Sequence, residues 1–304
     1  MSSTTTPEPQ ANIRSGVFNA LAAYTMWGVA PMYFILLSDI GADEILMHRI
    51  VWSSLFLLVL VLLMKKRQVL VSLCQQPRLV LKLTLSATIL AINWLLFIWA
   101  VNNGHLLDAS LGYFINPLFN VALGMFFFSE RLRRNQLIAV ILAIVGVLVQ
   151  LFTLGSLPII SLALASSFAI YGVLRKKMHV DSFVGLLVES LLMLPFALIY
   201  WSFFVESPTA NLMTNSYSLD ATLVLAGVVT TAAFLWFTAA ARRLAVSSLG
   251  FFQYIGPSIM FVLAVFYYQE SMQKAEFMTF LFIWSALALY SLDSYTYMRK
   301  GKRR

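Results

Sequence analysis

The sequence predicts an all-α integral membrane protein with ten membrane-spanning helices, arranged as two inverted five-helix repeats. Three observations support this fold class: the composition, a series of apolar runs of spanning length, and an internal repeat. Of the 304 residues, 60% are hydrophobic and only 11% are charged, and the mean hydropathy is +0.83. A soluble domain carries about 25% charged residues. The composition therefore excludes soluble and disordered proteins and indicates that lipid is the solvent.

Ten apolar runs meet or approach the length of about 20 residues that a helix needs to cross a bilayer. The first follows a polar stretch without the charged-then-apolar layout of a signal peptide, so we expect it to remain as a span. Only a short turn at 154–156 separates the fifth and sixth runs, which should form a tight hairpin. In chain order, the expected spans are residues 15–37, 44–64, 80–101, 107–128, 135–153, 157–174, 182–204, 220–240, 246–268 and 276–295.

Basic residues separate alternate pairs of spans and thereby predict the orientation. Nineteen of the 21 Lys and Arg residues fall near the termini or in the even-numbered loops, and such an excess marks the cytoplasmic side. We expect a multi-pass protein of the bacterial inner (plasma) membrane with both termini cytoplasmic. The nineteen are Arg14, Lys65, Lys66, Arg67, Arg78, Lys82, Arg131, Arg133, Arg134, Arg175, Lys176, Lys177, Arg242, Arg243, Arg299, Lys300, Lys302, Arg303 and Arg304.

The internal repeat is visible in short motifs. Ser-Leu-Gly-Tyr-Phe at residues 110–114 recurs as Ser-Leu-Gly-Phe-Phe at 248–252. Each copy leads to a proline, and a glutamate follows each proline thirteen residues later. The two prolines and two glutamates are Pro117, Pro257, Glu130 and Glu270. The second half is thus predicted to be a copy of the first.

Each copy contains five spans, at 15–153 and 157–295, and because five is odd the copies should enter the membrane with opposite polarity. Residues 1–14 are expected to form a disordered cytoplasmic tail and 296–304 a basic cytoplasmic tail. Inverted repeats are characteristic of secondary transporters, whose site lies near the midplane between the halves. The alternative is the loose self-similarity of helical membrane proteins in general, which would not invert the loop charges as well.

Two other functions compete with transport: an intramembrane enzyme and a non-transporting membrane receptor. A receptor would usually show larger soluble regions. An enzyme would need clustered reactive groups, yet the sequence has neither His-Glu-x-x-His nor Gly-x-Ser-x-Gly, and no Gly-rich phosphate loop for ATP. One cysteine and three histidines show no metal-ligand spacing. We expect no enzyme activity, no catalytic residues, no cofactor and no metal. The expected partners are a small organic solute, the lipid bilayer and a coupling proton, with no nucleic acid; monomer and homo-oligomer stay open.

Three stretches carry a resemblance to a known family. They are Trp-Gly-Val-Ala-Pro-Met-Tyr at 27–33, Glu-Ile-Leu-Met-His-Arg-Ile-Val-Trp-Ser at 44–53 and Gly-Tyr-Phe-Ile-Asn-Pro-Leu at 112–118. With the two five-helix repeats, they resemble the EamA-type drug/metabolite transporter superfamily over residues 15–295, and within it the RarD branch. The resemblance implies a ten-helix inner-membrane permease with a central cavity, which exports small organic solutes or drugs. It leaves the substrate open, chloramphenicol included.

Two ionisable side chains lie inside expected spans, where an Asp, Lys or Arg costs about 2.5–3.5 kcal/mol on insertion scales. They are Arg49 and Glu189, which the repeat makes equivalent because they are 140 positions apart. We expect both to line a solvated cavity. Arg49 would bind an anionic or carbonyl group, and Glu189 would bind a cation or carry the coupling proton. The alternative is structural: each satisfies nearby polar groups, or Arg49 snorkels to the interface.

Prolines and glycines in equivalent spans are predicted to form helix breaks or hinges at the site. Close helix packing on small residues is the alternative. The four residues are Gly112, Pro117, Gly250 and Pro257. The glutamate that ends each of these spans is expected to act as a cap or loop anchor.

The remaining cavity residues are aromatics and polar side chains. Rings could stack on a planar substrate, and buried amides need partners that a substrate or cavity water can supply. Each single residue is more often packing, so the set predicts a cavity better than its members do. The expected lining is Tyr24, Trp27, Asn93, Trp94, Tyr113, Asn116, Tyr171, Trp236, Gln253 and Tyr254.

Overall fold

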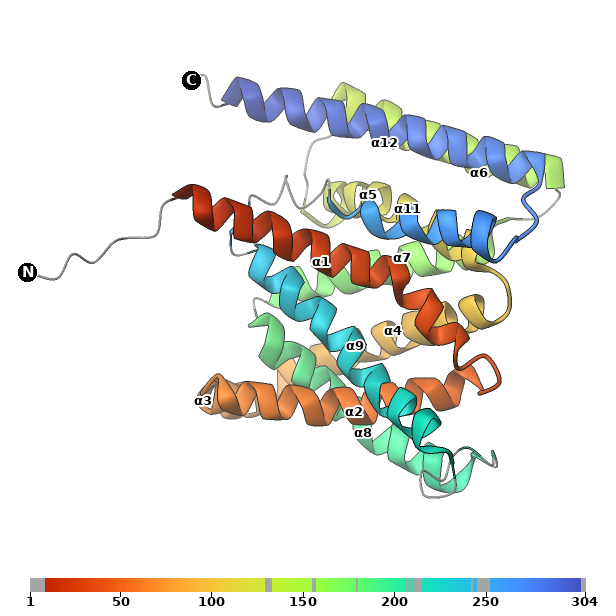
Figure 1. The fold of residues 1–304 in the computed structure, drawn as a ribbon. Coiled ribbons are helices and arrows are strands. Elements are labelled where there is room, and N and C mark those ends of the chain that lie inside the picture. Colours follow the sequence, from red (N-terminus) through yellow and green to blue (C-terminus); the bar gives the residue numbers. More distant parts are fainter. Residues whose placement is uncertain are drawn as a thin grey trace, which may run out of the picture.

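A computed structural model of the chain describes residues 9–128, 133–154, 157–178, 180–205, 207, 209, 215–241, 243–244 and 252–301. Over these residues the chain is helical and contains no strand (Figure 1). The elements are α1 (Pro9–Ile35), α2 (Ala42–Leu63), α3 (Arg67–Cys74), α4 (Pro77–Asn102), α5 (Leu106–Phe128), α6 (Arg134–Leu154), α7 (Ile159–Met178), α8 (Ser182–Phe203), α9 (Tyr217–Ala241), α11 (Ile255–Val262), the π-helix η2 (Leu263–Tyr267) and α12 (Lys274–Gly301).

Among the described helices, α2, α4, α6, α8, α9 and α12 are long and apolar enough to cross a membrane. An all-helical chain of this kind confirms the predicted integral membrane class. Shorter apolar stretches occupy Ile159–Arg175 in α7 and Ile255–Tyr267 in α11 and η2. The helices fall on the expected spans, although the described part of 246–268 is helical mainly over α11 and η2. The count of ten spans stays a prediction.

Two helices extend into segments that were expected to be tails. α1 begins at Pro9, so residues 9–14 are helical and not disordered. Proline suits the first turn of a helix, where its missing N–H has no partner to lose. α12 continues over 296–301 because neither proline nor glycine interrupts it before Gly301. Residues 1–8 and 302–304 lie outside the described part.

A short helix, α3, lies between α2 and α4 and was not expected. Its eight residues are too few to span a bilayer, so a search for long apolar runs misses it. Leu73 of α3 is buried in the core, whereas Val69 and Val71 are exposed. Exposed apolar side chains beside basic residues suit a position at the membrane interface.

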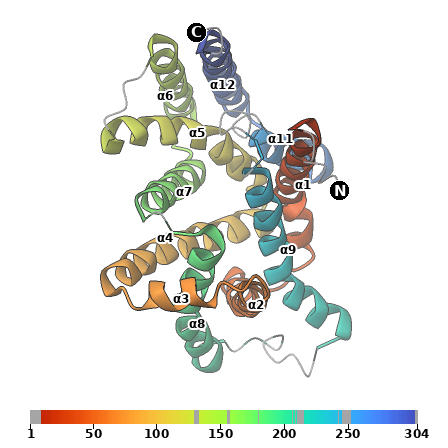
Figure 2. The same ribbon diagram turned by 90° about the vertical axis from the view of Figure 1, so that its left-hand side faces the viewer.

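The packing pairs helices of the first half with helices of the second. α6 packs along α12, and α2 packs along α8. α5 lies against α7 and α11, α1 against α9 and α11, and α4 against α7 and α8. Figure 2 shows α6 beside α12 at the top and α2 above α8 at the bottom, with α7 and α4 on one side and α9 and α1 on the other.

Two buried apolar clusters hold this arrangement. The larger includes Phe34, Phe114 and Phe280 and joins α1, α5 and α12. The smaller includes Leu57 and Leu187 and joins α2 to α8. The candidate site lies beside the smaller cluster.

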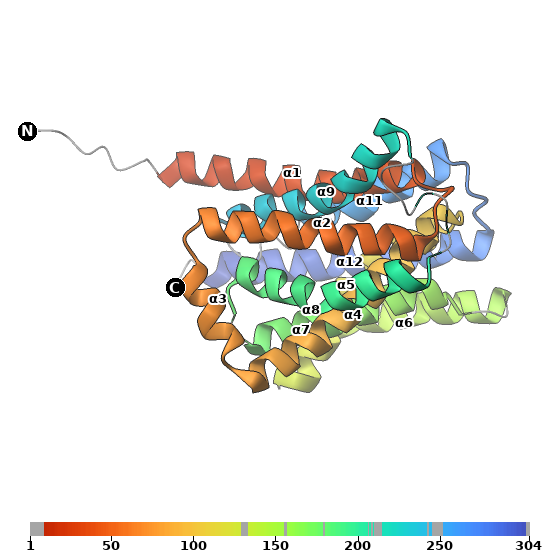
Figure 3. The same ribbon diagram turned by 90° about the horizontal axis from the view of Figure 1, so that it is seen from below.

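α1 begins and α12 ends at the same end of the bundle, where α3 also lies (Figures 1 and 3). Lys65, Lys66, Arg67 and Arg78 flank α3 at this end, which we call the basic end. Because both ends of the described chain lie together, the chain crosses the bundle an even number of times.

Large apolar side chains cover the outside of the bundle. Phe126 and Phe203 are each 79% exposed, which suits lipid but not water. Lipid also removes the hydrophobic drive between helices, so close packing on small residues must hold them together. Gly112 of α5 lies against α7: a Cβ at this position would be 2.8 Å from the carbonyl oxygen of Ser161 and 3.1 Å from its Cα.

Gly112→Ala is therefore expected to lower the free energy of unfolding by about 1–3 kcal/mol, because backbone atoms of α7 must move away. Gly172→Ala is the matched control, since a Cβ there has only the Asn120 side chain, at 3.9 Å, within contact distance. Thermal unfolding in detergent compares the two variants. Equal melting temperatures would show that the packing of α5 against α7 does not require a glycine at this position.

Candidate functional site

A buried carboxylate on α8 is held by side chains of α4 and α7. Glu189 is 2% exposed. Its Oε1 accepts a hydrogen bond from the hydroxyl of Ser86 at 2.5 Å, and its Oε2 accepts one from the phenol of Tyr171 at 3.2 Å. Nη1 of Arg175, one turn along α7, lies 3.6 Å from Oε1. A buried carboxylate needs such partners, so the charge of Glu189 depends on both neighbouring helices.

Arg49 of α2 is also buried, at 6% exposed, but its surroundings differ. Its Cζ lies 3.8 Å from the centroid of the Trp94 ring and 6.0 Å from that of Phe34. Its Nε is buried without a hydrogen-bond partner. No described residue forms a hydrogen bond or ion pair with Arg49, so the rings are its main stabilising contacts.

Arg49 and Glu189 occupy equivalent depths from opposite ends. Each lies seven residues after the first residue of its helix, which is about 10 Å along the helix axis. The end of α2 meets the start of α8 through Lys66 and Asp181, so the two helices run in opposite directions. The burial of both residues inside helices fits the sequence analysis, and their roles stay predictions.

Two small hollows lie between α2, α4, α8 and α9 and share Trp94, Leu186 and Ser190 in their lining. Glu189 lines one hollow and Arg49 the other. Each has room for about one water molecule. Neither hollow can hold an organic solute in this conformation unless the surrounding helices move apart.

Asn93 joins α4 to α7 close to this centre. Its Nδ2 donates to the carbonyl oxygen of Leu164 at 3.0 Å and to the hydroxyl of Ser167 at 2.8 Å. Its Oδ1 is buried without a hydrogen-bond partner. An open acceptor of this kind can receive a donor from water or a solute when the helices separate.

Other predicted aromatic residues pack helices together. The rings of Tyr24 and Trp27 on α1 lie 5.4 Å apart, and both contact Phe237 of α9. Tyr113 of α5 packs edge-on against Phe97 of α4, with ring centroids 5.7 Å apart. Neither these three predicted residues nor the two phenylalanines that they contact line the hollows. In this conformation they pack neighbouring helices against one another.

The structure places four further residues away from the hollows. Trp236 is 38% exposed on α9, whereas Phe234, two positions earlier, lines the hollow beside Arg49. The sequence alone does not distinguish these two residues, because a helix that is apolar all round does not reveal its inward face. Asn116 accepts a hydrogen bond from Asn120 within α5. The remaining two, Gln253 and Tyr254, lie at the start of α11.

The predicted helix breaks also need correction. α5 continues from Leu106 to Phe128 through Pro117, because neighbouring helices in a membrane tolerate one lost backbone hydrogen bond. Pro257 is the third residue of α11, within the first turn, where N–H groups lack intrahelical partners. Gly112 packs against α7 as described above. Gly250 lies outside the described residues, as does Glu130.

At the basic end, an ion pair joins the two halves. Nζ of Lys66, after α2, lies 2.5 Å from Oδ2 of Asp181, which precedes α8. Oδ1 of Asp181 also caps α8 by accepting from the N–H groups of Phe183 and Val184. Partial burial acts to raise the pKa of Asp181, but the bonds from Lys66, Val184 and Phe183 outweigh it and leave the pKa below its usual value.

A lowered pKa means that Asp181 stabilises the fold above its ordinary pKa of about 4, and that this contribution is lost as pH falls through the lower folded value. Asp181→Asn is therefore expected to lower the melting temperature at pH 7 by about 2 °C. The difference from the unmodified protein should shrink below about pH 4. Thermal unfolding across pH checks this, with the exposed Asp39→Asn as control. A difference that stays constant down to pH 3 would contradict it.

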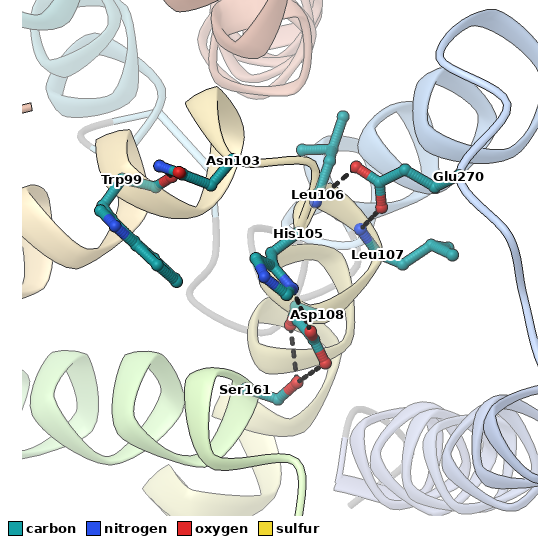
Figure 4. A network of polar contacts seen from close by, with 8 residues as sticks. All are labelled: Trp99, Asn103, His105, Leu106, Leu107, Asp108, Ser161 and Glu270. Carbon is teal, nitrogen blue, oxygen red and sulfur yellow. Dashed lines mark hydrogen bonds and ion pairs between the residues drawn. The ribbon is translucent and has the colours of Figure 1, made fainter.

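At the opposite end, a carboxylate of the second half caps a helix of the first (Figure 4). Oε1 and Oε2 of Glu270 accept from the backbone N–H groups of Leu106 and Leu107, each at 2.7 Å. These N–H groups begin α5 and have no intrahelical acceptor, and the negative charge suits the helix N-terminus. The expectation that this glutamate acts as a cap is confirmed, and the helix it caps belongs to the other half.

A second contact strengthens the same end (Figure 4). The hydroxyl of Ser161 on α7 donates to the carbonyl oxygen of Asp108 on α5 at 2.7 Å. Oδ2 of Asp108 lies 3.2 Å from Nδ1 of His105, whose ring stacks on Trp99. The start of α5 is thus held by both α7 and the segment after η2.

Sequence reasoning missed several of these residues. Ser86 and Thr231 look unremarkable in apolar spans, and Arg175 was counted among the basic residues of a loop although its side chain reaches Glu189. The spacing of Tyr171 and Arg175, one turn apart, was the available signal for a shared helix face.

Among the described residues, no group of three His, Cys, Asp or Glu side chains could hold a metal.

Comparison with known proteins gives consistent matches. The EamA-like transporter family matches residues 14–152. Protein RarD of Escherichia coli strain K12 is 53% identical over 290 residues, covering 95% of this chain and 98% of that protein. An uncharacterized transporter of Vibrio cholerae is 51% identical over 288 residues, covering 95% of both. The chloramphenicol-sensitive protein RarD of Pseudomonas aeruginosa is 32% identical over 300 residues, covering 95% of this chain and 97% of that protein.

A crystal structure of a protein with 17% sequence identity overlaps 93% of this chain and 99% of that chain, with a TM-score of 0.61. At this identity the likeness concerns the fold alone.

Proposed function

Because the chain belongs to the EamA-like transporter family and stands among its RarD proteins, we propose that it is a secondary transporter that moves small organic metabolites or drugs by alternating access. Membership makes it a membrane transporter of the drug/metabolite class. The proposal adds that ten spans form two inverted repeats, that the substrate binds between them, and that the transporter exports its solute. It also places the basic end in the cytoplasm, as expected for an inner-membrane protein.

The packing supports the inverted repeats. The counterparts of α1, α2, α4, α5 and α6 in the second half are α7, α8, α9, α11 and α12. Exchanging counterparts converts the most extensive contacts between the halves into one another: α5–α7 becomes α11–α1, α1–α9 becomes α7–α4, and α2–α9 becomes α8–α4. The pairs α2–α8, α5–α11 and α6–α12 map onto themselves. Two copies related by a two-fold axis in the membrane plane would produce this pattern.

The contacts at the two ends support alternating access. At the basic end, Lys66 of the first half binds Asp181 of the second. At the opposite end, the start of α5 in the first half binds Glu270 of the second. Each end thus has a bond between the halves, and in the proposed cycle the halves separate at one end while the bond at the other end stays formed.

The charged cluster supports proton coupling at Glu189. The carboxylate lies where α4 of the first half meets α7 and α8 of the second, with Arg175 as its counter-charge. Protonation would remove the attraction to Arg175 and loosen this seam. A proton gradient could then drive the change between inward-open and outward-open states.

The observation that carries the proposal is a pair of hollows lined from both halves, with one ionisable group at the same depth from each end. Proteoliposomes with purified protein provide the test. A panel of radiolabelled organic acids, amides and amines is offered with and without a pH gradient. We expect saturable flux of at least one class, stimulated by the gradient. Protein that inserts correctly and moves no solute under any gradient would contradict the proposal.

A further inference from the structure

Within the part of the chain that the structure describes, no acidic side chain forms an ion pair with the positive charge of Arg49. The other buried charges near the centre, Glu189 and Arg175, neutralise each other at 3.6 Å. The faces of Trp94 and Phe34 lie against the guanidinium of Arg49, and its Nε is buried and unpartnered. A buried arginine without hydrogen bonds is costly, so its donors are available to an incoming acceptor.

The hollow beside Arg49 has the lining that such an acceptor needs. No acidic side chain is among the described residues that line it. Four hydroxyl-bearing side chains, two aromatic rings and two leucines surround the guanidinium; they are Ser53, Ser190, Thr230, Thr231, Trp94, Phe234, Leu57 and Leu186. Ser53, Thr230 and Thr231 already donate to carbonyl oxygens of α9, so Ser190 carries the hydroxyl that can donate to an acceptor beside Arg49. The lining therefore combines the guanidinium of Arg49 with hydroxyl groups and with an apolar surface.

We propose that this hollow is the binding site of a small organic anion, with a carboxylate on Arg49 and an aromatic or apolar body against Trp94 and Phe234. The inference rests on the proposed transport function and names its substrate class. A guanidinium binds a planar carboxylate with two parallel hydrogen bonds, which would satisfy the unpartnered donors. The solute enters when the helices separate, and closure then buries the pair between α2, α4, α8 and α9.

The charges disfavour the other solute classes. A cation would approach Arg49 without a compensating acid in this hollow, because Glu189 lines the neighbouring one and is bound to Ser86, Tyr171 and Arg175. A neutral amide could accept from Arg49 but would leave its charge uncompensated after closure. Among solutes of similar shape, the affinity should therefore depend on the charge and be highest for the anion.

Matched probes test this selectivity. Benzoate, benzamide and benzylamine have similar shapes and carry negative, zero and positive charge, and indole-3-acetate adds a larger anion. Thermal unfolding of the purified protein in detergent measures each interaction, because a ligand that binds the folded state raises the melting temperature. We expect both anions to raise it in a saturable manner and benzamide and benzylamine to leave it unchanged.

Variants of Arg49 then assign the effect. Arg49→Gln should weaken the binding of the anions by about tenfold or more, and Arg49→Lys should retain the preference for anions with lower affinity. Lys82→Gln, which removes an exposed charge on α4, should bind as the unmodified protein does. If Arg49→Gln does not fold, the charge selectivity of the unmodified protein and of Arg49→Lys decides the matter.

Three results would overturn the proposal: equal stabilisation by benzoate and benzamide, binding of the anions unchanged in Arg49→Gln, or no stabilisation by either anion. Flux in proteoliposomes separates this failure from failure of the proposed function. Saturable transport of amides or amines alone would reject the anion site and leave the transporter standing. Absence of flux for every solute would reject both.

Discussion

Glu189→Gln is expected to abolish solute accumulation driven by a pH gradient while the protein still inserts and folds. Glutamine keeps the shape of the side chain, and its amide oxygen can still accept from Ser86, but its NH2 group cannot accept from Tyr171. It carries neither a transferable proton nor a charge. Arg175 then loses its partner at 3.6 Å, whether or not a gradient is present. Proteoliposomes measure accumulation with the gradient and exchange without it. Accumulation should fall to the level of exchange alone.

The double variant Glu189→Gln with Arg175→Gln controls for the unpaired arginine. Removing one partner of a buried pair costs about 3–5 kcal/mol, whereas removing both can cost little. The double variant should recover stability and still show no coupling to protons. Normal gradient-driven accumulation in Glu189→Gln would remove Glu189 from the mechanism and favour a structural role for the cluster.

Glu270→Gln is expected to favour opening of the end that faces away from the basic end. The carboxylate caps α5 through two charge-assisted hydrogen bonds of 2.7 Å. Glutamine can replace only one of them, with a neutral bond to its oxygen, and loses the other because its NH2 group cannot accept. Closure is weakened by about 1–2 kcal/mol, which is a factor of about 5–30 in the ratio of closed to open protein. Transport should slow, because a state that must close for each cycle becomes less populated. Initial rates of flux in proteoliposomes measure this effect.

Glu276→Gln is the matched control. Glu276 lies six residues further on and accepts from the backbone N–H of Gln273 near its own helix start, so it does not join the two halves. Its loss should leave the rate of flux unchanged. Equal rates for Glu270→Gln and the unmodified protein would show that the cap on α5 stabilises the fold without controlling access.

The features that could be predicted from the sequence are those that depend on composition and on the spacing of apolar and charged residues. Apolar runs separated by basic residues located the helices, and the cost of charge in lipid singled out Arg49 and Glu189, which the structure buries. The sequence could not show which face of a uniformly apolar helix turns inward. For that reason the prediction took Trp236 and passed over Phe234, and the hydroxyl groups beside Arg49 went unnoticed.

Contacts between distant segments were equally hidden. Glu270 was expected to act as a cap, but nothing in its neighbourhood indicated that the capped helix would begin at Leu106. Arg175 was assigned to a loop by its charge, whereas its side chain turns back along α7 toward Glu189. Glu270 and Leu106 lie in different halves, whereas Arg175 and Glu189 lie on α7 and α8 of the second half, so only the packing of helices brings each pair together.

Labelling of one cysteine from each side of the membrane tests the central claim most directly. Cys74, the single native cysteine, is replaced by serine, and Ser190, which lines both hollows, by cysteine. A membrane-impermeant thiol reagent is then added to vesicles of either orientation. We expect reaction from both sides, faster from the basic side in Asp181→Asn and faster from the opposite side in Glu270→Gln. Reaction from one side only, or from neither in any variant, would contradict a centre that opens to each side in turn.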